Sequence, residues 1–348
     1  MKRRTFVQTS LSTLAGSILL PSIGLSARDE LSKYQDFIIG HNSHQYKIDL
    51  NWGALDPDFY PVNDCHEMVQ DSKGRIILLT NHTKNNVIIY DKSGKLLEVW
   101  GTEFPGAHGL TLNNENGEEF LYISDNSRHE VIKTTIDGKI IMVLPYPADS
   151  GKYEKKEQYV PTETIVAPNG DIYVTDGYGL QYIMHYNSKG ELLNTFGGRG
   201  EEEKHFDNAH GICIDSRDKE NPTLLITDRN KNKFKRFTFQ GELLCTIDLP
   251  GCYVCRPVMH GEHIYCATIW SNDRSANTGF VSILDKNDQL ISAPGGSTPT
   301  YVDGKLNHMH QAVQVFKHPH DVCVDEDENL YVAQWNSGKT YPIKLLRV

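Results

Sequence analysis

A short unit with a histidine near its start occurs four times in this chain, and it constrains the fold more than any other feature. Each copy opens a segment of about forty residues in which apolar strands alternate with turns rich in Asp, Asn and Gly. The four openings are Asp64-Cys65-His66, Gly106-Ala107-His108-Gly109-Leu110, Asn208-Ala209-His210-Gly211-Ile212 and Pro319-His320-Asp321-Val322. Such repeats predict the blades of a β-propeller, whose first strands line a central channel. Residues at one repeat position therefore converge on one axis.

Six segments of this kind can be aligned, with openings near residues 64, 106, 161, 208, 254 and 318. The fifth, 254–295, is the most divergent. We predict an all-β fold: a six-bladed β-propeller with four-stranded antiparallel blades over residues 64–348. In the preceding segment, 28–63, the strand candidate Gln45–Leu50 would join the last blade and close the ring, which removes the exposed edges of an open sheet.

Length and charge agree with one exported domain that does not bind nucleic acid. The 348 residues exceed the usual single-core size, but every blade of a propeller packs only on its neighbours. The formal net charge is −10, and it becomes −13 when a signal carrying Lys2, Arg3 and Arg4 is removed. Phosphate backbones would be repelled on average, so we expect no nucleic-acid partner.

The first 27 residues predict an export signal. Lys2-Arg3-Arg4-Thr5-Phe6-Val7 precedes a modest apolar run that ends in small residues near Ser26 and Ala27, as in a twin-arginine signal. An ordinary secretory signal with a chance arginine pair is the alternative. The apolar run of about fifteen residues is shorter than the roughly 20 needed to span a membrane. Either signal predicts a periplasmic or secreted protein with no stable membrane span.

Seven cysteines cannot all pair within one chain, and most of them are expected to be packing residues. Cys252 and Cys255 have a spacing used in redox and zinc sites, but no second pair accompanies them. His308-Met309-His310 and His260-Gly261-Glu262-His263 are not predicted as metal sites, because loop histidines at such spacings are common.

The four histidines at one repeat position, in contrast, predict a metal site in the channel. Three neutral imidazoles leave a zinc ion with an open position, which is the catalytic pattern. Zinc lowers the pKa of a bound hydroxyl or water and polarises it. The alternative is a channel filled by histidines that only hydrogen-bond to their surroundings.

The chain resembles the peptidyl-α-hydroxyglycine α-amidating lyases, which are NHL-type propellers with three zinc-binding histidines in Pro-His-Gly-Leu, Pro-His-Ser-Leu and Met-Pro-His-Asp motifs. The matching residues are His108 in Ala-His-Gly-Leu, His210 in Ala-His-Gly-Ile and His320 in His-Pro-His-Asp. A family tyrosine in Ser-Asp-Gly-Tyr is matched by Tyr178 in Thr-Asp-Gly-Tyr, and a family arginine by Arg229 in Thr-Asp-Arg-Asn. The resemblance covers most of the propeller.

The resemblance implies a reaction and roles for these residues. An α-hydroxyglycine N–C bond would be cleaved to an amide and glyoxylate, with Tyr178 as general base once a cation lowers its pKa. Arg229 would hold the carboxylate of a peptide or small-molecule substrate. Asp321 and Leu110 would hold a structural calcium ion, with turn capping as the alternative role for Asp321. We expect a monomer.

The departures from the family leave the substrate open. The family has an arginine at the end of the second strand of the first blade, where this chain has Leu79-Thr80-Asn81-His82-Thr83-Lys84. His82 or Lys84 would then contact the substrate in its place. His318 stands where the family has methionine, and it is a further substrate-contact candidate. His66 adds a fourth histidine at the ligand position.

The sequence thus predicts an exported zinc-dependent lyase that acts on an α-hydroxyglycine-like compound. Two other classes stay open: a non-catalytic NHL propeller that binds a peptide or glycan, and a metallohydrolase in which zinc-bound water is the nucleophile.

Overall fold

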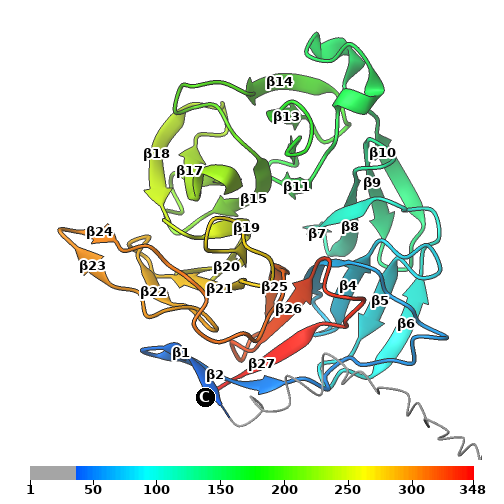
Figure 1. Ribbon diagram of the computed structural model, residues 1–348. Coiled ribbons are helices and arrows are strands. Elements are labelled where there is room, and N and C mark those ends of the chain that lie inside the picture. The colour runs from blue at the N-terminus through cyan, green and yellow to red at the C-terminus, as the bar shows by residue number, and fades with distance from the viewer. Residues whose placement is uncertain (1–36) are drawn as a thin grey trace, which may run out of the picture.

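The computed structural model describes residues 37–348, so the predicted export signal at 1–27 lies outside the described part. Six β-sheets surround a central channel, and the predicted all-β six-bladed propeller is confirmed (Figure 1). Helical structure within 37–348 is limited to the short 3-10 turns η2 (Ala148–Ser150), η3 (Lys156–Gln158) and η4 (Arg229–Lys231). None of the helices in these residues is long and apolar enough to cross a membrane.

Blades 1 to 5 each contain four antiparallel strands in chain order, from the channel outward. Blade 1 contains β3 (Cys65–Gln70), β4 (Ile76–Thr80), β5 (Val87–Tyr90) and β6 (Leu96–Trp100). Blade 2 contains β7 (Ala107–Glu115), β8 (Glu118–Asp125), β9 (Glu130–Thr135) and β10 (Ile140–Leu144). Blade 3 contains β11 (Glu163–Val166), β12 (Ile172–Thr175), β13 (Tyr182–Tyr186) and β14 (Leu192–Gly197). Blades 4 and 5 are formed by β15 (Ala209–Asp215), β16 (Thr223–Asp228), β17 (Lys233–Phe237) and β18 (Leu243–Asp248), and by β19 (Tyr253–His260), β20 (His263–Trp270), β21 (Phe280–Leu284) and β22 (Leu290–Ser292). A short hairpin, β23 (Tyr301–Val302) and β24 (Lys305–Leu306), precedes blade 6.

Blade 6 joins the two ends of the described chain. It contains β25 (Pro319–Val324), β26 (Leu330–Gln334) and β27 (Ile343–Arg347), followed by β2 (His44–Asp49) and β1 (Ile38–His41). β2 pairs antiparallel with β27, with Tyr46 opposite Arg347. The strand candidate at 45–50 therefore occupies the position that closes the ring, and β1 adds a fifth strand outside it.

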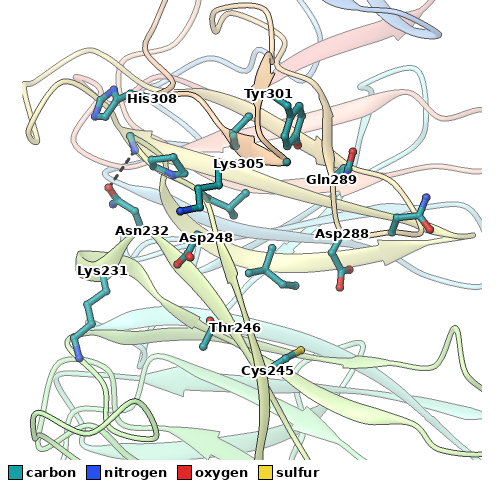
Figure 2. A pocket seen from close by; sticks show the side chains of 17 residues that line it. Lys231, Asn232, Cys245, Thr246, Asp248, Asp288, Gln289, Tyr301, Lys305 and His308 are labelled. Carbon is teal, nitrogen blue, oxygen red and sulfur yellow. Dashed lines mark hydrogen bonds between the residues drawn. The ribbon is translucent and has the colours of Figure 1, made fainter.

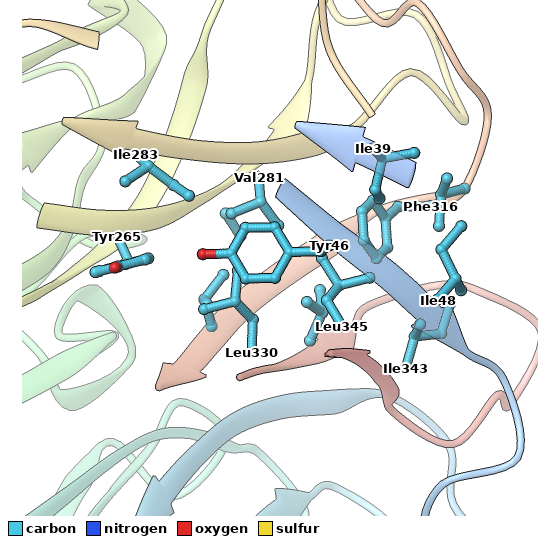
Figure 3. Packing of buried hydrophobic residues seen from close by; sticks show 14 of the residues in the cluster. Ile39, Tyr46, Ile48, Tyr265, Val281, Ile283, Phe316, Leu330, Ile343 and Leu345 are labelled. Carbon is cyan, nitrogen blue, oxygen red and sulfur yellow. The ribbon is translucent and has the colours of Figure 1, made fainter. Parts of the chain in front are cut away.

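Hydrophobic cores lie between the blades, because the second strand of each blade is buried on both faces. In β4, Ile76 and Leu78 pack toward blade 6, while Ile77 and Leu79 pack toward blade 2, and all four are fully buried. Successive strand residues point to opposite faces, so a continuous apolar run serves two interfaces. Figure 3 shows the core between blades 5 and 6, where Tyr46 and Ile48 of β2 join Tyr265 and Val281. The N-terminal strand is thus part of a core as well as of a sheet.

The tight turns of the repeat are formed by an Asp or Asn side chain. Asp71 Oδ1 accepts hydrogen bonds from the backbone amides of Lys73 (3.0 Å) and Arg75 (2.8 Å), and Gly74 takes a left-handed φ of 76°. Glycine adopts this backbone conformation without the steric cost that other residues meet. In blade 6 the corresponding turn begins at Asp325 and carries Glu328 at the left-handed position, with φ 59°.

Candidate active site

The residues at the repeated histidine position form one layer of the channel. In five of the six blades, the pairing between the first two strands shifts register at the residue that lies in this layer. These residues are His66, His108, His210, Cys255 and His320. A β-bulge of this kind bends the strand and re-aims its side chains, and it is common beside functional sites. The first strand is thus bulged at the histidine in four blades and at Cys255 in blade 5.

The four imidazoles lie close together and are buried. Ring centroids of His108, His210 and His320 are 4.8–4.9 Å apart, and the His66 ring is 4.8 Å from those of His108 and His320. One potential ligand atom from each of His66, His108 and His320 lies within 4.8 Å of the others, and the same holds for His210, Cys255 and His320. The structure thus unites the predicted trio, and it places the fourth histidine in the same ring.

Hydrogen bonds and burial prepare these rings to bind a metal. His108 Nδ1 donates to Thr162 O (2.8 Å) and His320 Nδ1 to His66 O (2.9 Å), which leaves the lone pair on Nε2 of each ring. Burial lowers the pKa of His66 to about 3 and keeps the pKa of the other three rings well below the usual range. His320 Nε2, His66 Nδ1 and His210 Nδ1 are buried without a hydrogen-bond partner. Neutral imidazoles with unfilled lone pairs fit a zinc-type ion.

Tyr178 and Arg229 extend the site toward the rim. The Tyr178 hydroxyl lies 3.0 Å from His108 Nε2 and 3.2 Å from His210 Nε2, and Arg229 Nη2 donates to it at 3.3 Å. Although 39% of the Tyr178 residue surface is exposed, its hydroxyl is enclosed by these three groups. Burial raises the pKa of Tyr178, and the neighbouring Arg229 opposes this effect without reversing it. Arg229 alone therefore leaves the hydroxyl protonated at neutral pH, and a further cation is needed to lower its pKa as the sequence analysis expects.

Arg229 is a buried guanidinium without a carboxylate. It is 5% exposed, its Nε has no hydrogen-bond partner, and no salt bridge joins it to an acidic side chain within residues 37–348. Its Nη1 points to Cys255 Sγ at 3.8 Å, and its carbon Cζ lies 5.4 Å from the centroid of the Trp270 ring. A buried positive charge in this state is ready to pair with an anionic ligand.

The residues predicted to hold calcium do not fit that ion. Arg256, which follows Cys255 in β19, donates to both oxygens of Asp321 (Nε–Oδ1 3.0 Å and Nη2–Oδ2 2.7 Å) and to the Leu110 carbonyl (Nη1–O 2.9 Å). The same guanidinium donates to Met68 O at 3.0 Å. Both predicted ligands of calcium are thus used by an internal cation, which corrects the expectation of a calcium ion between them.

Arg256 belongs to a second, charged layer of the channel. Its guanidinium lies 3.7 Å from Glu67 and 3.8 Å from Glu163, so it faces three buried carboxylates with Asp321. Gly211 permits this approach, since a Cβ there would lie 2.5 Å from Arg256 Cα. Beneath this layer, residues from the inner strands of all six blades line a depression of about 410 Å³ at the other end of the channel.

The remaining predicted contact residues lie around the rim. Lys84 Nζ donates to the Asp58 carbonyl (2.8 Å), and His82 Nδ1 accepts from the Lys84 amide (3.1 Å). Both ring nitrogens of His318 are engaged: the Asn277 amide donates to Nε2 at 3.2 Å, and Nδ1 donates to the Asn336 carbonyl at 3.2 Å. His318 therefore braces the loop 271–279, and its contact with a substrate stays a prediction.

Sequence reasoning missed Cys255, Arg256 and Trp270. Val254-Cys255-Arg256 occupies the positions of Cys65-His66-Glu67 in blade 1, so an alignment of the divergent fifth blade would have placed two of these residues in the channel layers. No comparable signal marks Trp270, whose ring lies 6.4 Å from that of His318 and 6.1 Å from that of Trp335. These rings form an aromatic wall beside Arg229.

A second cavity is unrelated to the ring. A groove of about 790 Å³ lies on the outer wall between blades 4 and 5, beside the β23–β24 hairpin (Figure 2). Its labelled lining residues include Lys231, Asp248 and Lys305, and none of the channel histidines contributes to it.

Fold and site define a class of protein: a six-bladed propeller that presents a histidine ring, a tyrosine and a buried arginine at one end of its channel. No family model matches the sequence. A Caenorhabditis elegans protein named as a probable peptidyl-alpha-hydroxyglycine alpha-amidating lyase, pgal-1, is 32% identical over 341 residues, which cover 91% of this chain and 84% of that protein. The chain belongs to the peptidyl-α-hydroxyglycine α-amidating lyase family.

Other similarities are shorter or limited to the fold. Peptidyl-alpha-hydroxyglycine alpha-amidating lyase 1 of Drosophila melanogaster is 35% identical over 118 residues, 30% of this chain and 20% of that protein. Human NHL repeat-containing protein 3 is 22% identical over 201 residues, 55% of this chain and 56% of that protein. The chain thus spans about a fifth of the length of the Drosophila protein and about half of the length of the human protein.

Among solved structures, a gluconolactonase from Xanthomonas campestris superposes with a TM-score of 0.58 at 14% identity, covering 90% of this chain and 96% of that one. A catalytically inactive variant of virginiamycin B lyase from Staphylococcus aureus superposes with a TM-score of 0.56 at 13% identity, covering 87% of this chain and 100% of that one. At these identities the similarity shows the fold alone.

Proposed function

We propose that this protein is a zinc-dependent lyase that cleaves the N–C bond of an α-hydroxyglycine-type substrate to an amide and glyoxylate. The observation that carries the proposal is the position of the Tyr178 hydroxyl, within 3.0–3.3 Å of two ring histidines and of Arg229. A candidate base, a histidine ring that can hold a metal and a guanidinium that can bind a carboxylate thus lie close enough together to act on one substrate molecule. Membership in the amidating-lyase family supports the same reaction.

Arg229 would bind the glycolate carboxylate. Its unfilled Nε donor and its lack of an acidic partner among the described residues leave a buried charge that a substrate carboxylate would satisfy. Bidentate pairing would fix the plane of the carboxylate and so direct the adjacent hydroxyl-bearing carbon toward Tyr178.

Tyr178 would move the proton that the cleavage requires. When its oxygen accepts the proton of the substrate hydroxyl, a carbon–oxygen double bond forms, the N–C bond breaks and its electron pair passes to the amide nitrogen, which takes up a proton. A zinc ion held by the histidine ring would supply Lewis acidity to a substrate oxygen. Arg229, 3.3 Å from the same phenol oxygen, stabilises its anionic form.

Three further elements belong to the proposal. His82 and Lys84 would contact the substrate in place of the family arginine of blade 1. The chain would act as a monomer outside the cytoplasm, after export through the signal at 1–27. A non-catalytic binding propeller and a metallohydrolase are the alternatives that the experiment must separate.

The test is a combined metal and product analysis of the full chain with α-hydroxyhippurate. We expect about one zinc ion at the ring, and benzamide and glyoxylate in equal amounts. The zinc at the ring and the enzymatic formation of the two products should both be lost in His320→Ala, which also reports the rate of spontaneous cleavage. Bound metal with products that contain added water would instead assign a hydrolase. Full activity without metal, or no metal and no turnover, would contradict the zinc-dependent lyase.

A further inference from the structure

We infer that a second zinc-type metal site lies at the seam between blade 5 and the N-terminal strand of blade 6, with His44, His263 and Glu328 as its ligands. It is independent of the channel ring and of the proposed lyase reaction. Its role would be to cross-link the closing strand to the neighbouring blade.

The three ligands come from three separate elements that the fold brings together. His44 begins β2, His263 begins β20, and Glu328 lies in the turn between β25 and β26. One ligand atom from each lies within 4.8 Å of the others, and the two imidazoles meet edge to face with centroids 4.7 Å apart. Two imidazoles and a carboxylate form a donor set that zinc uses.

The ligand atoms are in suitable states for a metal. His44 is 3% exposed, so its ring is held within the seam. Its Nδ1 is paired with Ser43 Oγ at 3.2 Å, which leaves Nε2 for a metal. Within residues 37–348 no hydrogen bond engages the His263 ring. An imidazole nitrogen that is free of other partners can serve as a metal ligand.

Glu328 is held in place by a strained backbone and by Arg347. Arg347 donates a hydrogen bond to the Glu328 carboxylate (Nε–Oε2 3.0 Å), which fixes the position of that side chain. The residue occupies, with φ 59°, the turn position where blade 1 has Gly74 with φ 76°. A side chain in this conformation has a cost of about 1 kcal/mol or more, and such strain gathers at functional positions.

The seam site lies at the opposite end of the propeller from the channel ring. The far end of β20, Trp270, has its ring centroid 5.4 Å from the Arg229 guanidinium, and His263 is at the other end of this eight-residue strand. At about 3.3 Å per residue the two ends are roughly 20 Å apart. Metal bound at the seam therefore shares no ligand with the ring.

Two tyrosines close to these ligands in the sequence belong to the buried core between blades 5 and 6. Tyr46, two residues after His44, and Tyr265, two residues after His263, lie in the same buried cluster (Figure 3). A metal at the seam would extend this apolar contact between β2 and β20 with a coordinate link. The stability with which β2 closes the circle of blades would then depend on the zinc concentration.

Zinc stoichiometry of the full chain tests the inference. Metal-stripped protein titrated with zinc chloride should bind two ions, one at the seam and one at the channel ring if the proposed function holds, and His263→Gln and His44→Gln should each bind one ion fewer than wild type. His308→Gln, which removes an exposed loop histidine, is the matched control and should still bind two. If His263→Gln retains both ions, the seam site does not exist.

A stability measurement separates this inference from the proposed function. In His108→Ala, where the channel ring is damaged, zinc at 100 times its dissociation constant should raise Tm by about 5 °C. The shift should disappear when His263→Gln is added. A shift that persists in the double variant would overturn the seam site, whereas loss of lyase activity in His108→Ala would leave it untouched.

Discussion

Replacement of Arg256 by methionine should destabilise the propeller strongly, because this guanidinium is the counter-ion of a buried acidic layer. Arg256 donates to Asp321 at 2.7 and 3.0 Å and lies 3.7 and 3.8 Å from Glu67 and Glu163, and these three acidic side chains are at most 1% exposed. Methionine keeps much of the volume of the side chain and removes the charge. The carboxylates would then have to ionise without a partner or take up protons.

The expected loss can be estimated from these contacts. Breaking a buried ion pair by removing one partner costs about 3–5 kcal/mol. The carbonyls of Met68 and Leu110 also lose their hydrogen bonds, at 3.0 and 2.9 Å, so the upper half of this range applies. For a domain of this size, that corresponds to a decrease in Tm of roughly 6–10 °C.

Thermal and urea unfolding of Arg256→Met against wild type measure the loss. The matched control is Arg128→Met, whose ion pair with Glu130 is 31% exposed on the arginine side and should contribute at most about 1 kcal/mol. In Arg256→Ala the oxygens of the acidic layer become free for a hard cation, so millimolar calcium should restore part of Tm in this variant and none in wild type. Equal stability of the two methionine variants would refute the counter-ion argument.

Two further predictions concern the site, and a third concerns the buried carboxylate of Asp176, which accepts hydrogen bonds from Tyr153 and from the backbone amide of Leu180. Tyr178→Phe should retain metal and lose at least 100-fold in kcat, measured by glyoxylate release; unchanged turnover would remove its role as base. Arg229→Lys keeps the charge but not the planar fork, so KM should rise about tenfold or more with a smaller change in kcat. Burial raises the pKa of Asp176 to about 6, above its unfolded value near 3.8, so its contribution to stability is full below about pH 4 and is lost as pH rises through 6. Asp176→Asn should remove this pH dependence, on the order of 2–3 kcal/mol, from unfolding curves recorded between pH 4 and 7.

The histidine ring could be predicted because a propeller converts equal repeat position into spatial proximity. His66, His108, His210 and His320 needed only the alignment of blade openings, and the structure places all four in one layer. The roles of Tyr178 and Arg229 depended on family resemblance, since neither residue type at a strand end indicates chemistry. The closing strand near 45–50 followed from the need to remove sheet edges.

Other features depend on three-dimensional relations that no repeat encodes. Asp321 beside a ligand histidine resembles a calcium ligand in sequence, and only the path of the Arg256 side chain across the channel shows which cation it meets. His44 and Glu328 are far apart along the chain, and their meeting depends on the register of β2 with β27 and on the packing of blade 5 against blade 6. His318 could be assigned only once both of its ring hydrogen bonds were visible.

The pairing of β2 with β27 has a consequence for the order in which the molecule can be completed. Tyr46 and its partner Arg347 are 301 positions apart in the sequence, so the hydrogen bonds between β2 and β27 cannot form until β27 has been synthesised. Contacts of such long sequence separation form slowly, because the loop between them must first be closed. Loss of β27 would therefore leave β2 paired with β1 alone and uncover the core around Tyr46, so a chain that lacks this strand exposes apolar surface and an open sheet edge.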